Sequence, residues 1–222
     1  MERYVLEAEK TVIEETFEAS SESESLFEAN YNVIGGSPMP IVIKDEEERK
    51  VVSAIWGLKR QSGDDLQSVA QEEVLKDDEL KKLVSVSPCI IPASGFYKWK
   101  KSVKDPLPFL LRVIKQDVMS FAGLCTITKD ENGKTTRSFA VITMPANALV
   151  EPLHQSMPVI LEEKDFGRWL SGHAPEMLRD GFEGNHLLPD MTVFRVPELV
   201  NDPSNNSKEL IQPIPKLRNY ED

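Results

Sequence analysis

A predicted β-hairpin in the middle of the chain constrains the fold more than any other feature of the sequence. Two apolar runs, 121–128 and 137–143, flank a turn that contains Asn132 and Gly133. Asn-Gly favours the positive backbone angles of a type I′ turn, which joins two antiparallel strands. Residues 41–43 and 51–55 predict a second hairpin. Further strands are predicted from short apolar runs bounded by Gly, Pro or charged residues: 1–6, 31–34, 89–91, 96–99, 109–114 and 191–196.

Helices are predicted in fewer places. Residues 72–84 carry apolar side chains at close to helical spacing, and Val12, Ile13 and Phe17 show the same spacing within 7–30. A short helix is predicted over 164–170. An exposed loop is predicted over 20–25, a turn over 92–95 and an irregular tail over 208–215. Because strands and helices do not alternate strictly, the pattern favours an α+β fold over a doubly wound parallel sheet. All 222 residues are expected to form one domain, 1–222.

The composition excludes several classes of protein. No run of about 18 apolar residues, the length of a membrane-spanning helix, occurs in the chain. The N-terminus is charged and lacks the apolar core of a secretory signal, so we expect a cytoplasmic protein. The two cysteines, Cys89 and Cys125, lie inside apolar runs. They predict buried thiols rather than a disulfide framework or a zinc set.

Neither a metal nor a cofactor is expected. The three histidines, His154, His173 and His186, are far apart in the sequence and lack the spacing of metal ligands. The chain has no glycine-rich phosphate loop, no His-Glu-x-x-His pattern and no Gly-x-Ser-x-Gly elbow. Generic motifs therefore assign no enzyme class to this chain.

The negative charge is concentrated near the N-terminus. The net charge is −11, and residues 1–50 hold 13 acidic and 5 basic side chains, against 24 and 21 in the remainder. Nucleic-acid binders gain affinity by neutralising phosphates with Lys and Arg, so this balance argues against general nucleic-acid affinity. It is still compatible with a local basic cleft. Residues 7–30 are predicted to be partly exposed, and this acidic segment is a candidate docking site for an unknown protein partner.

Three places hold residue types that can carry chemistry. Trp56 ends a predicted strand beside Lys59 and Arg60, and 89–99 combines Pro, Gly and three aromatic residues. Both are interpreted either as ordinary core strands or as an aromatic and basic floor for bases and phosphates. His154 lies between two prolines, where it is either a general acid–base or a histidine that hydrogen bonds a loop.

Seven short segments, spread over most of the chain, carry a family resemblance. They are Tyr31-Asn32-Val33, Trp56-Gly57-Leu58, 89–99, 121–124, 143–147, 154–161 and 209–213. In this order they resemble the SRAP family, the abasic-site-processing and SOS-response-associated proteins, and the chain is identified as a member. The resemblance implies a mainly β SRAP fold, with a twisted antiparallel, barrel-like sheet and peripheral helices.

The resemblance also implies a chemistry related to the DNA-damage response. Family members begin Met-Cys-Gly-Arg, and removal of Met exposes a Cys whose amine and thiol capture the aldehyde of an abasic site in single-stranded DNA as a thiazolidine. The family is also linked to self-cleavage of a short leader, a peptidase activity. This chain starts Met1-Glu2-Arg3, one residue shorter. Four catalytic positions are implied: Glu2 in place of the Cys, Ser68 in place of an Asn, Lys98 in place of a Glu, and the retained His154.

Nucleic-acid contacts are implied at further positions. Ala70 and Ser156 stand where the family has phosphate-binding Arg, whereas Arg3, Glu72 and Thr143 stand as the family has them. With two Arg positions lost, we expect weak binding to single-stranded DNA. The candidate nucleic-acid-binding residues are Arg3, Trp56, Lys59, Arg60, Glu72, Thr143 and Ser156.

These replacements favour a divergent SRAP protein that has lost the crosslinking step and is a pseudoenzyme. Its cleft is expected still to bind a ligand, single-stranded nucleic acid or a partner protein. Glu2 has no thiol to close a thiazolidine ring, and Lys98 is a cation where the family has a proton-transferring carboxylate. Two alternatives stay open. One is an active abasic-site-processing protein or thiol autopeptidase with an altered N-terminus. The other is an amine-based enzyme that forms a Schiff base through Lys98 or the Met1 α-amine.

Overall fold

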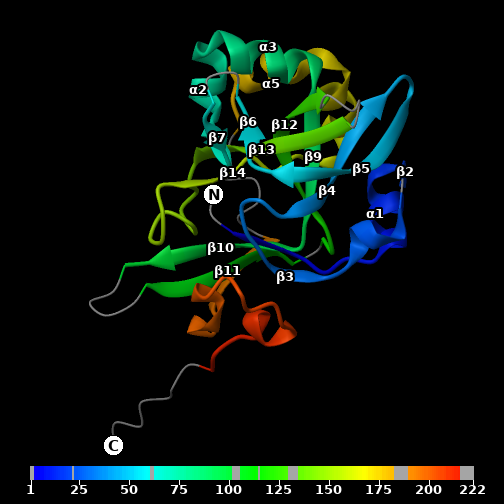
Figure 1. The fold of residues 1–222 in the computed structure, drawn as a ribbon. Coiled ribbons are helices and arrows are strands. Elements are labelled where there is room, and N and C mark those ends of the chain that lie inside the picture. Colours follow the sequence, from blue (N-terminus) through cyan, green and yellow to red (C-terminus); the bar gives the residue numbers. More distant parts are fainter. Residues whose placement is uncertain are drawn as a thin grey trace, which may run out of the picture.

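The computed structural model describes residues 3–21, 23–60, 63–101, 106–114, 116–129, 135–182 and 190–215. These ranges are mainly β (Figure 1), which confirms the predicted fold class. The strands are β1 (Tyr4–Leu6), β2 (Ala19–Ser21), β3 (Asn30–Val33), β4 (Pro38–Asp45), β5 (Glu48–Trp56), β6 (Leu58–Lys59), β7 (Asp65–Leu66), β8 (Ser68–Ala70), β9 (Pro88–Ala93), β10 (Gly95–Lys100), β11 (Leu107–Val113), β12 (Met119–Lys129), β13 (Thr135–Pro145), β14 (Ser156–Pro158) and β15 (Met191–Arg195). The helices are α1 (Lys10–Phe17), α2 (Gln71–Lys76), α3 (Asp78–Val86), α4 (Phe166–Arg168) and α5 (Ala174–Asp180), with short 3₁₀ turns at Glu24–Phe27, Glu163–Asp165, Glu198–Asn201 and Lys208–Ile211 and a π turn at Trp169–His173.

Five strands close into a barrel in the order β13-β12-β9-β4-β5. Neighbours in this order pair antiparallel, except at the closure, where β5 runs parallel to β13 and Ile55 lies opposite Ser138. β8 and β14 pair with β13, and β2 pairs with β5. Closing a sheet on itself removes exposed strand edges. The barrel confirms the predicted barrel-like sheet.

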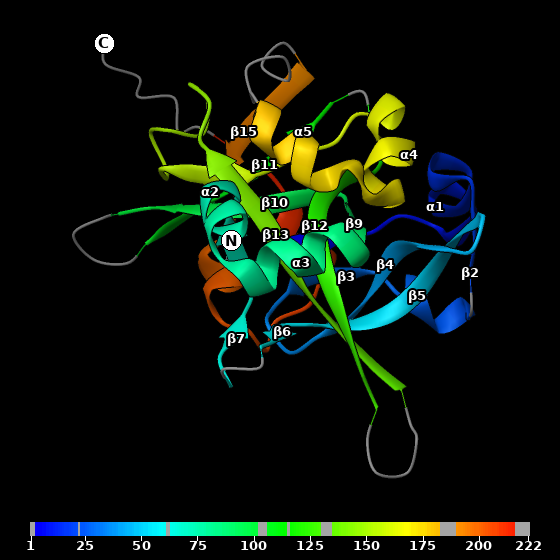
Figure 2. The same ribbon diagram turned by 90° about the horizontal axis from the view of Figure 1, so that it is seen from above.

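Both predicted hairpins are present. β12 pairs with β13 from Gly123 opposite Val141 to Lys129 opposite Thr135, and β4 pairs with β5. Figure 2 shows the β12–β13 hairpin projecting well beyond the barrel. The Asn132-Gly133 turn itself lies outside the described residues.

A second sheet, in the order β15-β11-β10-β1-β3, lies against the barrel (Figure 1). The chain passes from the barrel to this sheet at Ser94, between β9 and β10. The predicted turn over 92–95 is therefore wrong, because Pro92 and Ala93 still pair with β12. The backbone N–H of Ser94 donates to the carbonyl of Val5 at 2.7 Å, and its Oγ accepts from the backbone of Glu7 at 3.0 Å.

Aromatic side chains fill the space between the barrel and the second sheet. Tyr4 on β1 packs edge-to-face on Trp56, with ring centroids 5.1 Å apart, and Phe96 on β10 packs in the same way on Phe121 at 6.0 Å. All four side chains are fully buried. Burying a large apolar side chain stabilises a fold by about 1.5–3 kcal/mol. This aromatic layer therefore joins the two sheets and sets the path of β1 between them.

α2, α3 and α5 pack together over one end of the barrel (Figure 1). The single helix predicted over 72–84 is in fact two helices. Asp77 takes an extended backbone conformation between them (φ −86°, ψ 120°), and its side chain accepts from the backbone N–H of Leu80 at 3.0 Å. Asp77 thus acts as the N-cap of α3. No helix in the described ranges is long and apolar enough to cross a membrane.

Two segments predicted to be irregular are ordered by partners elsewhere in the chain. In the predicted loop 20–25, β2 pairs with β5, and Glu14 accepts from the backbone N–H of Ser21 at 3.0 Å and from its hydroxyl at 2.6 Å. In the predicted tail 208–215, Leu210 is fully buried in a cluster with Val5 and Tyr97. The predictions hold for residues 23–25, which are exposed, and for 212–215, which lie outside any helix or strand, and they miss β2 and the burial of Leu210. These contacts with distant segments leave no signal in the local sequence pattern.

Candidate functional site

Three segments that are far apart in the sequence meet near the end of β13. β8 runs parallel to β13 and places Ala70 opposite Thr143. β14 runs antiparallel to β13 and places Ser156 opposite Pro145. Since side chains alternate along a strand, this register puts four implied site positions on one face of the sheet: Ser68, Ala70, Thr143 and Ser156. We call these four residues the β13 face.

The β13 face carries no charged side chain of its own. Thr143 is buried, with 6% of its surface exposed, and its Oγ1 donates to the carbonyl of Val69 at 3.3 Å. Ser68, Ala70 and Ser156 are half-buried. Hydroxyl groups and a methyl group therefore stand where the resemblance implies two Arg side chains and an Asn.

His154 lies just before β14, on a loop that Asn147 shapes. The Asn147 side-chain oxygen accepts from two backbone N–H groups, those of Leu149 and Val150, both at 3.2 Å. The His154 backbone N–H donates to the carbonyl of Val150 at 3.0 Å. The imidazole is exposed, and its Nδ1 accepts from the backbone N–H of Ser156 at 3.0 Å. With Nδ1 as an acceptor, a neutral ring carries its proton on Nε2 and can donate a hydrogen bond from that atom.

Lys98 lies on the second sheet rather than on the barrel. It stands on β10 opposite Phe109 of β11, and only 4% of its surface is exposed. The neighbouring Tyr97 donates its backbone N–H to the carbonyl of Arg3 at 3.1 Å, so the start of the described chain runs beside the Lys98 strand. In Figure 1 this blue segment enters between β10 and β14. Glu2, the remaining implied catalytic position, lies outside the described residues.

Arg3 binds the protein's own backbone. Its guanidinium donates to the carbonyl oxygen of Val200 and, at 3.0 Å, to that of Asn201. It also donates to the side-chain oxygen of Asn32 at 3.3 Å and lies over the Trp99 ring, 5.4 Å from the centroid. The donors expected to hold a phosphate thus hold the 3₁₀ turn at Glu198–Asn201.

Asn32 completes this contact between the two ends of the chain. Its amide nitrogen donates to the carbonyls of Asp202 at 3.1 Å and Asn205 at 2.9 Å. Asn32 and Asn147 were not among the predicted site residues. Both lie in segments that carry the family resemblance, and that placement was the signal that could have found them. Their hydrogen bonds indicate that they position the chain around the site.

Trp56, Lys59 and Arg60 do not form the expected aromatic and basic floor. Trp56 is fully buried, and its indole N–H donates to the carbonyl of Gln67 at 2.8 Å, so the ring has no exposed face on which a base could stack. Lys59 is exposed and forms an ion pair with Asp65. Arg60 pairs with two carboxylates, those of Asp77 at 2.6 Å and Glu79 at 3.1 Å. Burial of Trp56 favours the alternative interpretation, an ordinary core strand, and Arg60 is paired locally.

The first turn of α2 adds two polar side chains next to Ala70. Glu72 is exposed, and one of its oxygens accepts from the amide nitrogen of Gln71 at 3.4 Å. Gln71 is 9% exposed, and its buried side-chain oxygen has no hydrogen-bond partner among the described residues. Sequence reasoning missed Gln71, because nothing in the local pattern shows that a helical Gln beside Ala70 is buried. In the described ranges, no three or more His, Cys, Asp or Glu side chains gather to hold a metal ion.

The closed barrel, the second sheet and the polar β13 face define the class of this protein. The chain matches the family described as SOS response associated peptidase (SRAP) over residues 2–203. It belongs to the SRAP family, which confirms the resemblance carried by the seven sequence segments.

Individual relatives agree with this assignment. The chain is 28% identical over 200 residues to the abasic site processing protein YoqW of Bacillus subtilis (strain 168), covering 85% of this chain and 88% of YoqW. It is 26% identical over 146 residues to the abasic site processing protein HMCES of Xenopus tropicalis, covering 57% of this chain and 43% of HMCES. A crystal structure of a protein from Bacteroides thetaiotaomicron shares the fold, with a TM-score of 0.79 at 16% identity, covering 96% of this chain and all 100% of that chain.

Proposed function

We propose that this chain is a SRAP protein that has lost the thiazolidine crosslink and keeps a site for single-stranded nucleic acid at the β13 face. The observation that carries this proposal is where the thiols lie. Cys89 on β9 and Cys125 on β12 are both buried within the barrel. A thiazolidine needs an amine and a thiol on neighbouring carbons, so that both attack the same aldehyde carbon. A cysteine inside a strand has no free α-amine, so neither thiol can close that ring.

Lys98 supports the loss of the crosslinking step. Where the family has a carboxylate that moves protons, this chain has a buried lysine on β10. A protonated lysine has no lone pair with which to accept a proton, so Lys98 in that form does not replace the carboxylate as a general base. The abasic-site-processing relatives therefore indicate which nucleic acid to test, and not which reaction to expect.

The charges around the site support weak binding of nucleic acid. The net charge is −11. Arg3 is bonded to backbone carbonyls, and Arg60 is paired with two carboxylates. Affinity for single strands comes largely from neutralised phosphates. We expect a dissociation constant no tighter than about micromolar at physiological salt, the range of non-specific binding.

The burial of Lys98 favours a second candidate function, imine formation with an aldehyde. Lysines in desolvated surroundings serve as Schiff-base nucleophiles, because burial favours the neutral amine. The Lys98 amine would add to the aldehyde carbon of an abasic site, and loss of a water molecule would leave a C=N bond. This imine lacks the second ring bond of a thiazolidine and hydrolyses readily.

One experiment tests both candidates. The protein is incubated with single-stranded DNA that holds one abasic site, with and without borohydride, and heated before a denaturing gel. We expect no heat-stable adduct without reductant and at most a minor trapped adduct with it. A trapped adduct that Lys98→Met removes, and that Lys82→Met on the exposed face of α3 leaves unchanged, would favour the imine. A heat-stable adduct without reductant would contradict the loss of crosslinking.

A further inference from the structure

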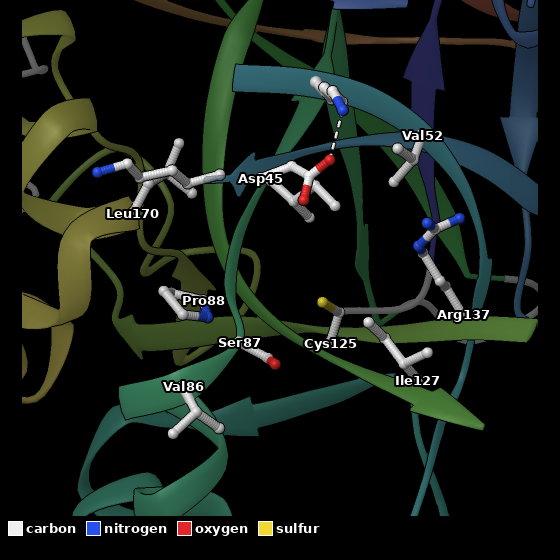
Figure 3. A pocket seen from close by; sticks show the side chains of 12 residues that line it. Asp45, Val52, Val86, Ser87, Pro88, Cys125, Ile127, Arg137 and Leu170 are labelled. Atoms are coloured by element: carbon white, nitrogen blue, oxygen red, sulfur yellow. Dashed lines mark hydrogen bonds and ion pairs between the residues drawn. The ribbon is translucent and has the colours of Figure 1, made fainter. Parts of the chain in front are cut away.

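A pocket lies on the barrel toward the other end of β13 from the β13 face. Its volume is about 230 Å³, and residues from β4, β5, β12, β13 and the end of α3 line it, among them Asp45, Lys50, Val86, Cys125, Ile127 and Arg137. Figure 3 shows the Cys125 sulfur directed into this pocket, with Arg137 and Ile127 beside it. A water molecule takes up about 30 Å³ in the liquid, so the pocket admits molecules of that size to the sulfur.

Cys89 reaches Cys125 from the neighbouring strand. β9 and β12 pair antiparallel with Cys89 opposite Gly123, and the backbone N–H of Cys125 donates to the carbonyl of Ser87 at 3.0 Å. The two cysteines are therefore diagonal neighbours on one face of the sheet. A Cβ on Gly123 would lie 3.1 Å from the Cys89 sulfur, so the missing side chain leaves room for this thiol. The two thiols are therefore close enough for each to shift the pKa of the other.

The two thiols are chemically unequal. Complete burial raises the pKa of the Cys89 thiol well above its ordinary value, and its hydrogen bond with Cys125 adds to this. The hydrogen bond from Cys89 lowers the pKa of Cys125, and the positive charge of Arg137 lowers it further, against the effect of burial. The thiolate is the reactive form of cysteine. Cys125 is thus the nucleophile of the pair, and Cys89 is a protonated thiol beside it.

We propose that Cys125 is a site of oxidation by small hydroperoxides and that Cys89 is its resolving thiol, so that the pair closes into an intramolecular disulfide. With hydrogen peroxide, the Cys125 thiolate attacks one oxygen, the O–O bond breaks, and the other oxygen leaves as hydroxide, which takes up a proton to become water; an alkyl hydroperoxide releases an alkoxide, which becomes an alcohol. Cys125 is now a sulfenic acid. The Cys89 sulfur attacks the Cys125 sulfur, the S–O bond breaks, and the oxygen leaves as a second water with the Cys89 proton.

The sheet geometry predicts a disulfide that is easily reduced. Diagonal neighbours in an antiparallel pair have Cα atoms about 7–8 Å apart. Disulfides rarely span more than about 7 Å, and those at that limit store strain that makes them more reducible. Closing this bond must therefore draw β9 and β12 together, and a thiol reductant restores both cysteines.

The test uses the full chain, whose only two cysteines make thiol counting unambiguous. Native protein is treated with hydrogen peroxide, then denatured together with N-ethylmaleimide and weighed by mass spectrometry. We expect two adducts before treatment and none after it, on a monomer, and the return of both adducts after dithiothreitol. Peptide mapping should find Cys89 joined to Cys125. Two adducts that persist after peroxide, or a disulfide only between chains, would overturn the proposal.

Variants assign the two roles. In Cys89→Ser, Cys125 should stop at the sulfenic acid, which dimedone present at denaturation captures. In Cys125→Ser, Cys89 should keep its thiol, and its oxidation at the wild-type rate would overturn the assignment. Arg137→Gln removes a positive charge that lowers the pKa of Cys125 and should slow the first step about two- to threefold, while Arg179→Gln on α5 leaves it unchanged. If a variant does not fold, a short time course of dimedone capture on wild-type protein identifies the cysteine that forms the sulfenic acid. We expect the label on Cys125, and label on Cys89 would contradict the proposal.

Discussion

The Arg3 guanidinium donates a hydrogen bond to the carbonyl oxygen of Asn201 at 3.0 Å, and so joins two parts of the chain that lie 198 residues apart. Asn201 in turn accepts from the indole N–H of Trp99 through its side-chain oxygen at 2.7 Å. The start of the described chain is thereby fixed beside β10, the strand that carries Lys98. The residue that the family resemblance suggests for phosphate contact instead has a structural partner within the protein.

Replacing Arg3 should destabilise the fold. Hydrogen bonds from a charged donor contribute about 1.5–3 kcal/mol, and Arg3→Gln removes several at once. We expect a loss of about 2 kcal/mol in the free energy of unfolding, measured by urea denaturation. Arg179→Gln, at an exposed position on α5, is the control and should change stability by no more than about 0.5 kcal/mol. Similar losses for both variants would show that the contact with Asn201 is weak.

Two tyrosine hydroxyls predict opposite effects of the same substitution. The Tyr4 hydroxyl is buried and has no hydrogen-bond partner among the described residues, whereas that of Tyr97 donates to the carbonyl of Tyr31 at 2.7 Å. Tyr4→Phe removes an unsatisfied polar group and should raise the free energy of unfolding by about 1 kcal/mol. Tyr97→Phe should lower it by about the same amount. Thermal unfolding of the two variants measures this, and a loss for Tyr4→Phe would reveal a partner for that hydroxyl.

The N-cap of α3 should make stability depend on pH. The hydrogen bond from the backbone N–H of Leu80 and, after it, the Arg60 ion pair lower the pKa of Asp77. The pKa of Asp77 is lower in the folded state than in the unfolded state. The Asp77 carboxylate therefore contributes its full stabilisation above the unfolded pKa of about 4, and this stabilisation is lost as the pH falls through the folded-state pKa. Asp77→Ala should cost about 1 kcal/mol at pH 7 and progressively less in acid. The exposed Asp117→Ala is the control, and a cost that does not change with pH would contradict this account.

Restoring positive charge on the β13 face should strengthen DNA binding. Ala70→Arg and Ser156→Arg place guanidinium groups at the two positions where the family resemblance implies them. Each added phosphate contact should steepen the dependence of log affinity on log salt by about 0.7 for single strands. Fluorescence anisotropy with a labelled single-stranded oligonucleotide measures both affinity and slope. Gln116→Arg, away from this face, is the control, and equal gains in all three variants would indicate non-specific attraction.

Lys98 and His154 are expected to face one another across the N-terminal segment. If they do, removing the lysine charge relieves repulsion of the protonated imidazole and raises the pKa of His154. The measurement is an NMR titration of the imidazole signals, which His154→Gln assigns among the three histidines. Lys98→Met should raise the His154 pKa, whereas Lys82→Met on α3 should not. An unchanged His154 pKa in Lys98→Met would show that the two side chains are too far apart to interact, and it would contradict a shared site.

The sequence by itself determined most of the longer strands, both predicted hairpins and the family to which the chain belongs, but not short strands such as β2 and β8. Those features depend on local patterns: alternating apolar runs, turn residues and short motifs such as Trp56-Gly57-Leu58. Burial of both thiols also followed from their apolar neighbours.

The tertiary structure alone decided what the candidate site residues contact. The parallel pairing of β8 with β13 brings Ser68 and Ala70 to Thr143, and the closure of β5 onto β13 buries Trp56. Partners for Arg3 and Arg60 likewise come from distant segments. A side chain's exposure and charge balance depend on all the segments packed around it. Local periodicity reports only its neighbours along the chain.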